Sequence, residues 1–93
     1  MPVKPVNLPI DGTLDLHTFK PEDIPDLLTD YFTACIDKSI YSIRIVHGKG
    51  KGILKKRVQD LLKKDEMVAS FRSAPPEAGG WGATLVELKR RDL

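Results

Sequence analysis

The chain has 93 residues, of which 41% are hydrophobic and 30% are charged, and its formal net charge is +2. This length supports one hydrophobic core and therefore one domain. No apolar run approaches the ~18 residues that span a bilayer, and the N-terminus lacks the apolar segment of a secretory signal, so no membrane partner is expected. Cys35 is the single cysteine. It excludes an internal disulfide, and we interpret it as a core residue of a cytoplasmic protein.

The first half of the chain predicts a strand, a helix and a second strand. Residues 1–12 contain three prolines and are expected to form an extended leader. Residues 13–17 alternate apolar and polar side chains, which is typical of a strand. Apolar residues then recur at helical spacing over residues 21–37, and the helix is expected to begin at Pro21 or at Pro25. Residues 42–46 are rich in β-branched side chains and predict the second strand.

The second half predicts a glycine-rich loop, a helix and two strands. The loop covers residues 47–52, and the helix after it has an apolar face at positions i, i+4, i+7 and i+8. Residues 67–72 and 83–88 predict the last two strands, separated by a loop over residues 73–82 that contains two prolines and three glycines. The apolar face of the helix consists of Leu54, Val58, Leu61 and Leu62. We therefore expect a domain over residues 13–90, followed by a short tail at residues 91–93.

This β-α-β-α-β-β order predicts an α/β fold, a two-layer sandwich with a four-stranded mixed sheet and both helices on one face. The first three strands should be parallel because helices connect them, and the fourth should be antiparallel because only a loop precedes it. Leu14, Leu16, Ile43 and Ile45 alternate with polar residues and should face the helices. Asp15, His17 and Arg44 should then point to an open, polar face.

Chemically active residues gather where the predicted strands end. His17 ends the first strand and His47 ends the second, so both imidazoles should lie at the same edge, about 4.8 Å apart if the strands are neighbours. Two histidines at that spacing could address one phosphate. The loop before the fourth strand, with Gly80, Trp81 and Gly82, should fall at the same edge. Trp81 is equally compatible with stacking on a base and with packing against the sheet.

The loop after His47 has the composition of an anion-binding loop. Its glycines allow a close backbone approach, its lysines supply charge, and it opens into a helix whose first amide groups lack internal partners. It is not a Walker A loop, because no Gly-Lys-Ser/Thr occurs, and it is not a dinucleotide-binding loop, because Ile53 stands at the third glycine position. A glycine-rich turn with solvated lysines is the alternative. The predicted nucleic-acid or phosphate contacts are Gly48, Lys49, Gly50, Lys51, Gly52, Lys55, Arg44, Gly80, Trp81 and Gly82.

The charges are divided along the chain. Residues 21–37 contain five acids and no base, whereas residues 44–64 contain eight bases and one acid. The basic segment favours an anionic partner, DNA or RNA, although a solvated helix face has the same pattern.

Together, Leu14-Asp15-Leu16-His17, then His47-Gly48-Lys49-Gly50, then a glycine loop running into Ala83-Thr84-Leu85-Val86, resemble the Smr (small MutS-related) domain family. The resemblance covers about residues 10–90. It implies a fold similar to the C-terminal domain of a bacterial translation initiation factor, and DNA or RNA binding with endonuclease activity in several members. Such domains occur within longer proteins and as free small proteins, the form expected here. One position departs from the family pattern, because Thr18 stands where many members have glycine.

These residues predict an endonuclease with Asp15, His17 and His47 as catalytic residues. On RNA, one imidazole would take the proton of the 2′-hydroxyl and the other would protonate the leaving oxygen. DNA needs an activated water, usually with a divalent metal such as Mg²⁺ or Mn²⁺, and these three side chains are too few to claim a metal site. The alternatives are a non-catalytic nucleic-acid- or ribosome-binding module and a protein-interaction adaptor. The preference for DNA or RNA and the oligomeric state stay open.

Overall fold

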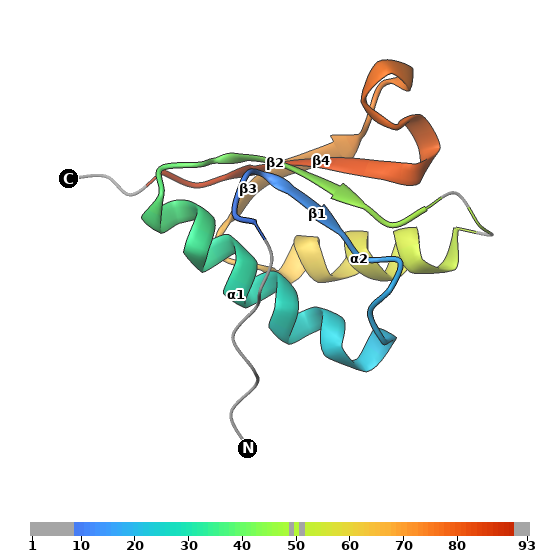
Figure 1. Ribbon diagram of the computed structural model, residues 1–93, viewed down its shortest axis with the longest axis horizontal. Helices are drawn as coiled ribbons and strands as arrows, with labels where there is room; N and C mark the ends of the chain where they lie inside the picture. The colour runs from blue at the N-terminus through green and yellow to red at the C-terminus, as the bar shows by residue number, and fades with distance from the viewer. Residues whose placement is uncertain (1–8, 49, 51, 91–93) are drawn as a thin grey trace.

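Four strands form one mixed sheet, and two helices cover a single face of it (Figure 1). The computed structural model describes residues 9–48, 50 and 52–90. The predicted two-layer α/β sandwich is confirmed. The elements are β1 (Thr13–Asp15), η1 (Pro21–Asp23), α1 (Ile24–Asp37), β2 (Ser42–Val46), α2 (Ile53–Lys64), β3 (Val68–Ser73), η2 (Pro76–Ala78), η3 (Gly80–Gly82) and β4 (Ala83–Leu88), where η marks a short 3-10 turn.

The strands lie in the order β1-β2-β4-β3. β1 and β2 are parallel neighbours, with Leu14 opposite Ile45, as expected for two strands joined by a crossover helix. β4 is antiparallel to both β2 and β3, so β3 points in the same direction as β1 and β2. The predicted strand directions are therefore confirmed. We call the end of the sheet where β1, β2 and β3 finish and β4 begins the carboxyl edge.

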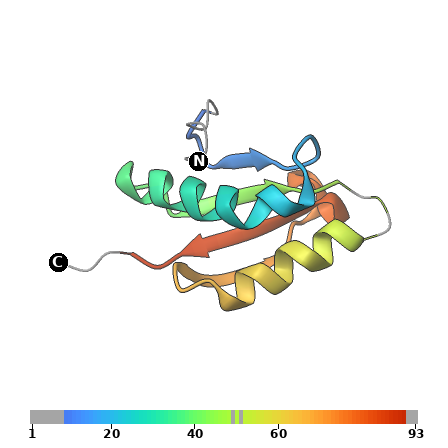
Figure 2. The ribbon, with the colours of Figure 1, turned by 90° about the horizontal axis from the view of Figure 1, so that it is seen from below.

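The helices bury their apolar stripes against the sheet, with α1 over β1 and β2 and α2 over β4 and β3 (Figure 2). α1 begins at Ile24, after the turn of η1, so Pro25 lies in the first turn, where its missing N–H costs no helical hydrogen bond. Cys35 is buried, as predicted, and burial raises the pKa of its thiol. The buried residues of α1 are Ile24, Leu27, Leu28, Tyr31, Phe32, Cys35 and Ile36.

α2 contributes less apolar surface than α1. Val58 and Leu62 are buried, while the other two residues of its predicted apolar face are partly buried. Ile53, at the start of the helix, is 74% exposed. Lys55 also lies on the buried stripe and is only 7% exposed. A lysine at such a position has to place its ammonium group against a partner.

Tyr31 fixes the start of β1 to α1. Its hydroxyl accepts a hydrogen bond from the N–H of Gly12 and donates one to the carbonyl of Thr13, both at 3.1 Å. Burial raises the pKa of Tyr31 to about 12. The Gly12 carbonyl accepts from the N–H of Arg44 at 2.7 Å, so Gly12, predicted to belong to the leader, is bound to the sheet. The rest of the leader up to residue 8, and the tail at residues 91–93, lie outside the described residues.

Some element boundaries differ from the prediction. β1 ends at Asp15 instead of His17, because the chain turns there and the N–H of Phe19 donates to the carbonyl of Leu16. β3 begins and ends one residue later than predicted, and the loop before β4 contains the turns η2 and η3. Within the described part of the chain, no helix has the length and apolar character needed to cross a membrane.

Candidate functional site

Three loops meet at the carboxyl edge, as predicted. The amide groups of His47 and Gly48 both donate to the carbonyl of Gly82, at 3.0 Å each, which joins the loop after β2 to the turn before β4. The N–H of Leu16 donates to the carbonyl of Val46 at 2.8 Å and continues the pairing of β1 with β2 beyond the last strand residue. The segments that carry His17, the glycine loop and Trp81 are therefore held together by backbone hydrogen bonds.

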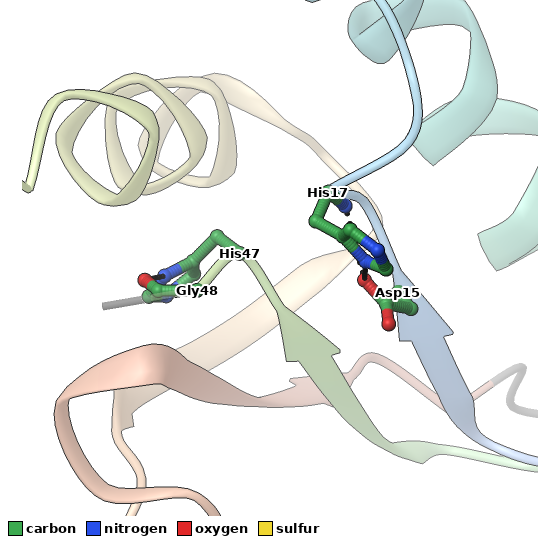
Figure 3. A network of polar contacts seen from close by, with 4 residues as sticks. All are labelled: Asp15, His17, His47 and Gly48. Atoms are coloured by element: carbon green, nitrogen blue, oxygen red, sulfur yellow. Dashed lines mark hydrogen bonds and ion pairs between the residues drawn. The ribbon is translucent and has the colours of Figure 1, made fainter. Parts of the chain in front are cut away.

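Asp15 and His17 form a polar pair on the exposed side of this edge (Figure 3). One carboxylate oxygen of Asp15 accepts the backbone N–H of His17 at 3.0 Å and contacts the ring atom Nδ1 at 2.5 Å. The side chains of His17 and Asp15 are 64% and 50% exposed. The backbone N–H of His17, and after it the imidazole, hold the pKa of Asp15 below its ordinary value. The carboxylate of Asp15 therefore contacts both the backbone and the imidazole of His17.

The turn that follows His17 accepts a threonine. Residues Leu16 to Phe19 form a turn closed by a 3.0 Å hydrogen bond between the Phe19 N–H and the Leu16 carbonyl. Thr18 does not adopt a positive φ in this turn. Glycine is therefore not required at position 18, and the departure from the family pattern leaves the position of His17 intact.

His47 lies at the same edge but faces the other side of the sheet, beneath α2. It is 5% exposed. The reason is strand alternation: Ile43, Ile45 and His47 occupy successive positions on the buried face, whereas His17 continues the open face of Thr13 and Asp15. The prediction of a shared edge is confirmed. The expectation that both imidazoles address one phosphate is corrected, because only His17 is exposed there.

Both ring nitrogens of His47 have partners inside the protein. Nδ1 lies 3.1 Å from the carbonyl oxygen of Gly48, and Nε2 lies 2.9 Å from the hydroxyl oxygen of Thr84. A carbonyl can only accept, so Nδ1 carries the proton and donates to Gly48, and Nε2 accepts from Thr84. Gln59 of α2 donates to the same hydroxyl at 3.4 Å. Burial lowers the pKa of His47, and the nearby cation of Lys55 acts in the same direction.

The glycine loop is shaped by its backbone. Gly48, Gly50 and Gly52 all have positive φ, and Gly52 is the left-handed residue before the first turn of α2, with no side-chain cap. The N–H of Gly48 is bound to Gly82, so it is not available to a phosphate as the sequence suggested. Gly50 and Gly52 stay candidate phosphate contacts. The two predicted lysines of this loop, Lys49 and Lys51, lie outside the described residues.

Arg44 holds the turn before β4. Its guanidinium Nη1 donates to the carbonyl of Ala78 at 3.2 Å, and the side chain is partly buried on the open face of the sheet. A Cβ added to Gly79 would lie 2.9 Å from the Cβ of Ala83, so the chain needs glycine at this point of the turn. Arg44 was predicted as a nucleic-acid contact. In the structure its guanidinium is partly committed to positioning the loop.

Lys55 and Trp81 form a cation–π pair across the same edge. The ammonium nitrogen of Lys55 lies 3.5 Å from the centroid of the Trp81 ring, and Trp81 is 57% exposed. Both were predicted as binding residues from separate patterns, and the structure brings them together. Of the flanking glycines, Gly82 uses its carbonyl to bind the loop after β2, and the N–H of Gly80 donates to the carbonyl of Pro75 at 2.9 Å.

The described residues do not form a metal centre. They contain no group of three or more His, Cys, Asp or Glu side chains placed to hold a metal ion. Asp15 and His17 contact each other, and His47 is turned towards Thr84. The three side chains considered from the sequence for a divalent ion therefore do not fit as a ligand set.

Two residues of the site were not recognised from the sequence, Thr84 and Gln59. Thr84 is fully buried in β4 and shares the helix-facing side with Val86 and Leu88. A hydroxyl at a core-facing strand position indicates a buried hydrogen bond, and this signal was present in the sequence. The partner, His47, is 37 positions away and required the fold.

A family model described as Smr domain matches residues 14–89. The chain belongs to the Smr domain family. It is 42% identical over 76 residues to endonuclease MutS2 of Staphylococcus carnosus, an alignment that covers 82% of this chain and 10% of that protein. It is 40% identical over 80 residues to endonuclease MutS2 of Staphylococcus epidermidis, which covers 86% of this chain and 10% of the relative. This chain thus spans about a tenth of the length of these curated relatives.

Solved Smr structures share the fold. The crystal structure of the Smr domain of Thermus thermophilus MutS2 superposes with a TM-score of 0.77 at 30% identity, over 83% of this chain and 96% of that one. YdaL, a stand-alone small MutS-related protein from Escherichia coli, superposes with a TM-score of 0.78 at 25% identity, over 89% of this chain and 67% of that one. The predicted Smr family and its mixed α/β sheet are confirmed.

Proposed function

We propose that this Smr domain binds DNA or RNA at the carboxyl edge and cleaves a phosphodiester bond there, with His17 as the general base. The observation that carries the proposal is the contact between His17 and Asp15, on the exposed side of an edge that also holds a glycine loop. The aligned staphylococcal relatives are named endonuclease, which supports phosphodiester cleavage as the reaction. We place this activity in the cytoplasm, consistent with a single, buried cysteine.

The contact with Asp15 assigns the two ring nitrogens of His17 to different tasks. When Nδ1–H donates to the carboxylate, Nε2 has a lone pair that can take a proton. That proton comes from the 2′-hydroxyl of RNA or from a water molecule. The resulting oxygen nucleophile attacks phosphorus, the bond to the leaving oxygen breaks, and the leaving oxygen takes a proton from solvent. Asp15 stabilises the imidazolium that forms and keeps its ring in place.

A single exposed imidazole limits the mechanism. The entering and leaving oxygens lie on opposite sides of the phosphorus in an in-line displacement, so one ring serves only one of them. Because His47 is buried with both nitrogens bonded, we assign it to positioning: it holds the Gly48 carbonyl and so shapes the glycine loop. The described side chains do not form a ligand set for a metal ion, so each step above uses only side chains of this domain and solvent.

The test is cleavage of end-labelled single- and double-stranded DNA and RNA by the wild type, His17→Ala and Asp15→Asn, each with Mg²⁺, Mn²⁺ or EDTA. We expect His17→Ala to bind with unchanged affinity and to lose cleavage. Binding without cleavage by the wild type would favour the non-catalytic nucleic-acid- or ribosome-binding module. Absence of binding to all four substrates would favour the protein-interaction adaptor.

A further inference from the structure

Trp81 is an exposed aromatic ring that is nevertheless fixed in place. Its surface is 57% exposed, whereas the Lys55 side chain that lies over its ring is 7% exposed. The ring lies beside Gly52, where an added Cβ would be 3.4 Å from its Cζ2 atom. A cation at 3.5 Å from the centroid is attracted by the negative face of the ring. A buried lysine therefore contacts a ring that is more than half exposed to solvent.

A positively charged groove lies beside this ring. It has a volume of about 330 Å³ and is formed between α2 and the end of β3. Lys56 and Lys63 line it from α2 and are 79% and 67% exposed, with Asp60 as the acid between them. Gln59 and Ser73 supply uncharged polar groups to its lining. Exposed pairs of this kind are weak, so a phosphate can replace Asp60 as the partner of either lysine.

The groove does not contain Asp15 or His17. β1 and β4 are separated by one strand, β2, so the end of β1 and the start of β4 lie roughly 10 Å apart. Trp81 is in the turn η3, directly before β4.

We propose that Trp81 is a stacking platform for an unpaired base of the nucleic acid, with Lys55 fixing the ring and Lys56 and Lys63 contacting neighbouring phosphates. This inference rests on the proposed function and narrows its substrate to nucleic acid that has unpaired nucleotides. A base within a duplex is already stacked on both faces and offers no face to the ring. A single strand offers a base face and a phosphate at every nucleotide, which matches an aromatic ring beside two lysines.

The experiment uses the fact that Trp81 is the only tryptophan of the chain. Intrinsic fluorescence is followed while a single-stranded oligonucleotide, or a blunt duplex of the same sequence, is added to the full chain. We expect the single strand to quench the fluorescence and the duplex to leave it nearly unchanged. Trp81→Ala should raise the Kd for the single strand about five- to 150-fold, measured by anisotropy of a labelled strand. Trp81→Phe, which keeps a smaller aromatic ring, should raise this Kd by a smaller factor.

The role of the lysine is separated from its packing by Lys55→Met, which keeps the apolar stem and removes the charge. A matched control is Arg90→Met, since Arg90 lies 4.6 Å from the Tyr41 ring in the other cation–π pair of the described residues. We expect Lys55→Met to weaken single-strand binding and Arg90→Met to leave it unchanged, with circular dichroism showing that both variants are folded. Equal Kd values for wild type and Trp81→Ala, with normal cleavage, would overturn the stacking platform and leave the proposed function standing. A wild type that binds neither oligonucleotide would overturn both.

Discussion

The hydroxyl of Thr84 donates to Nε2 of His47 at 2.9 Å, beneath α2 and out of contact with solvent. The opposite ring nitrogen donates to the Gly48 carbonyl, so His47 connects the buried face of β4 to the glycine loop. Gln59 donates to the same hydroxyl and adds α2 to the network. This arrangement leaves His47 no nitrogen with which to touch a substrate, which supports the positioning role proposed for it.

Replacing Thr84 by valine tests this network. The two side chains have nearly the same shape, so the change removes the hydroxyl and leaves His47 and Gln59 without their shared partner. Losing a buried hydrogen bond in this way costs about 1–3 kcal/mol of unfolding free energy, which urea denaturation measures. Thr33→Val is the control, since its exposed hydroxyl donates to the Thr29 carbonyl within α1 and lies 3.9 Å from the sulfur of Met67. A Thr84→Val protein as stable as Thr33→Val would contradict the network.

Two substitutions at His47 separate positioning from catalysis. Asparagine keeps an N–H group that can donate to the Gly48 carbonyl, whereas alanine removes both ring contacts. We expect His47→Ala to weaken nucleic-acid binding on the order of tenfold, or about 1.4 kcal/mol, and His47→Asn to retain most of the affinity. At saturating substrate, both variants should keep kcat near that of the wild type. A collapse of kcat in His47→Asn with unchanged affinity would instead show that His47 transfers protons.

The buried state of His47 predicts how stability depends on pH. Burial lowers the pKa of His47 in the folded protein, so the unfolded chain binds a proton at higher pH than the folded chain. Stability is therefore fully present above about pH 6.5 and is lost as the pH falls through the folded pKa. Asp15, whose pKa is also lowered, adds a loss of the same sign in more acidic solution. Urea midpoints at pH 8, 7, 6 and 5 should decrease for the wild type and less so for His47→Asn.

The sequence predicted the arrangement of the edge because that arrangement follows from chain connectivity. A helix between two strands makes them parallel, so His17 and His47 were expected at one edge, and a loop before the last strand was expected beside them. Asp15 and His17 are two residues apart in the predicted strand and therefore share a face, so their contact could also have been predicted. These relations depend on local patterns and the handedness of crossovers. They do not depend on how the core is packed.

The side of the sheet on which His47 lies could also have been predicted from the sequence. Ile43, Ile45 and His47 alternate on one side of β2, which places the imidazole with the core residues. The partner of Lys55 could not have been predicted. The position of Lys55 on the buried stripe of α2 indicates that its ammonium group has a partner but does not identify that partner. Trp81 is far along the chain in an irregular turn, and only the packed fold brings it to Lys55.

The role of Asp15 can be tested against a nearly identical acid in the same segment. Asp15 accepts the N–H of the residue two positions later, and Asp11 does the same with Thr13 at 3.0 Å, but only Asp15 also contacts an imidazole. A general base contributes about 100- to 10,000-fold, so His17→Ala should lower kcat by at least about 100-fold. Asp15→Asn should lower it by at least about tenfold with KM unchanged, and Asp11→Asn should leave it unaltered. Equal losses in the two aspartate variants would indicate a structural role for both.

The salt dependence of binding locates the phosphate contacts. Lys56 and Lys63 line the groove beside Trp81 and are largely exposed. Each phosphate contact on a single strand adds about 0.7 to the slope of log K against log salt concentration, because binding releases condensed counterions. The double variant Lys56→Met, Lys63→Met should therefore bind single strands of any base sequence more weakly. The magnitude of its slope should be smaller by about 1.4. Lys49→Ala, Lys51→Ala, chosen from the sequence alone, should reduce the slope in the same titration.

A matched variant distinguishes contact from overall charge. Lys38 follows the end of α1 and Lys89 follows β4, so both lie at the end of the sheet away from the carboxyl edge, and both are exposed. Lys38→Met, Lys89→Met removes the same two charges as the groove variant. If net charge alone attracted the nucleic acid, the two double variants would weaken binding equally, with the effect fading as salt screens long-range attraction. If the groove holds phosphates, Lys56→Met, Lys63→Met should change the slope and Lys38→Met, Lys89→Met should not, since counterions are released only where phosphates are contacted.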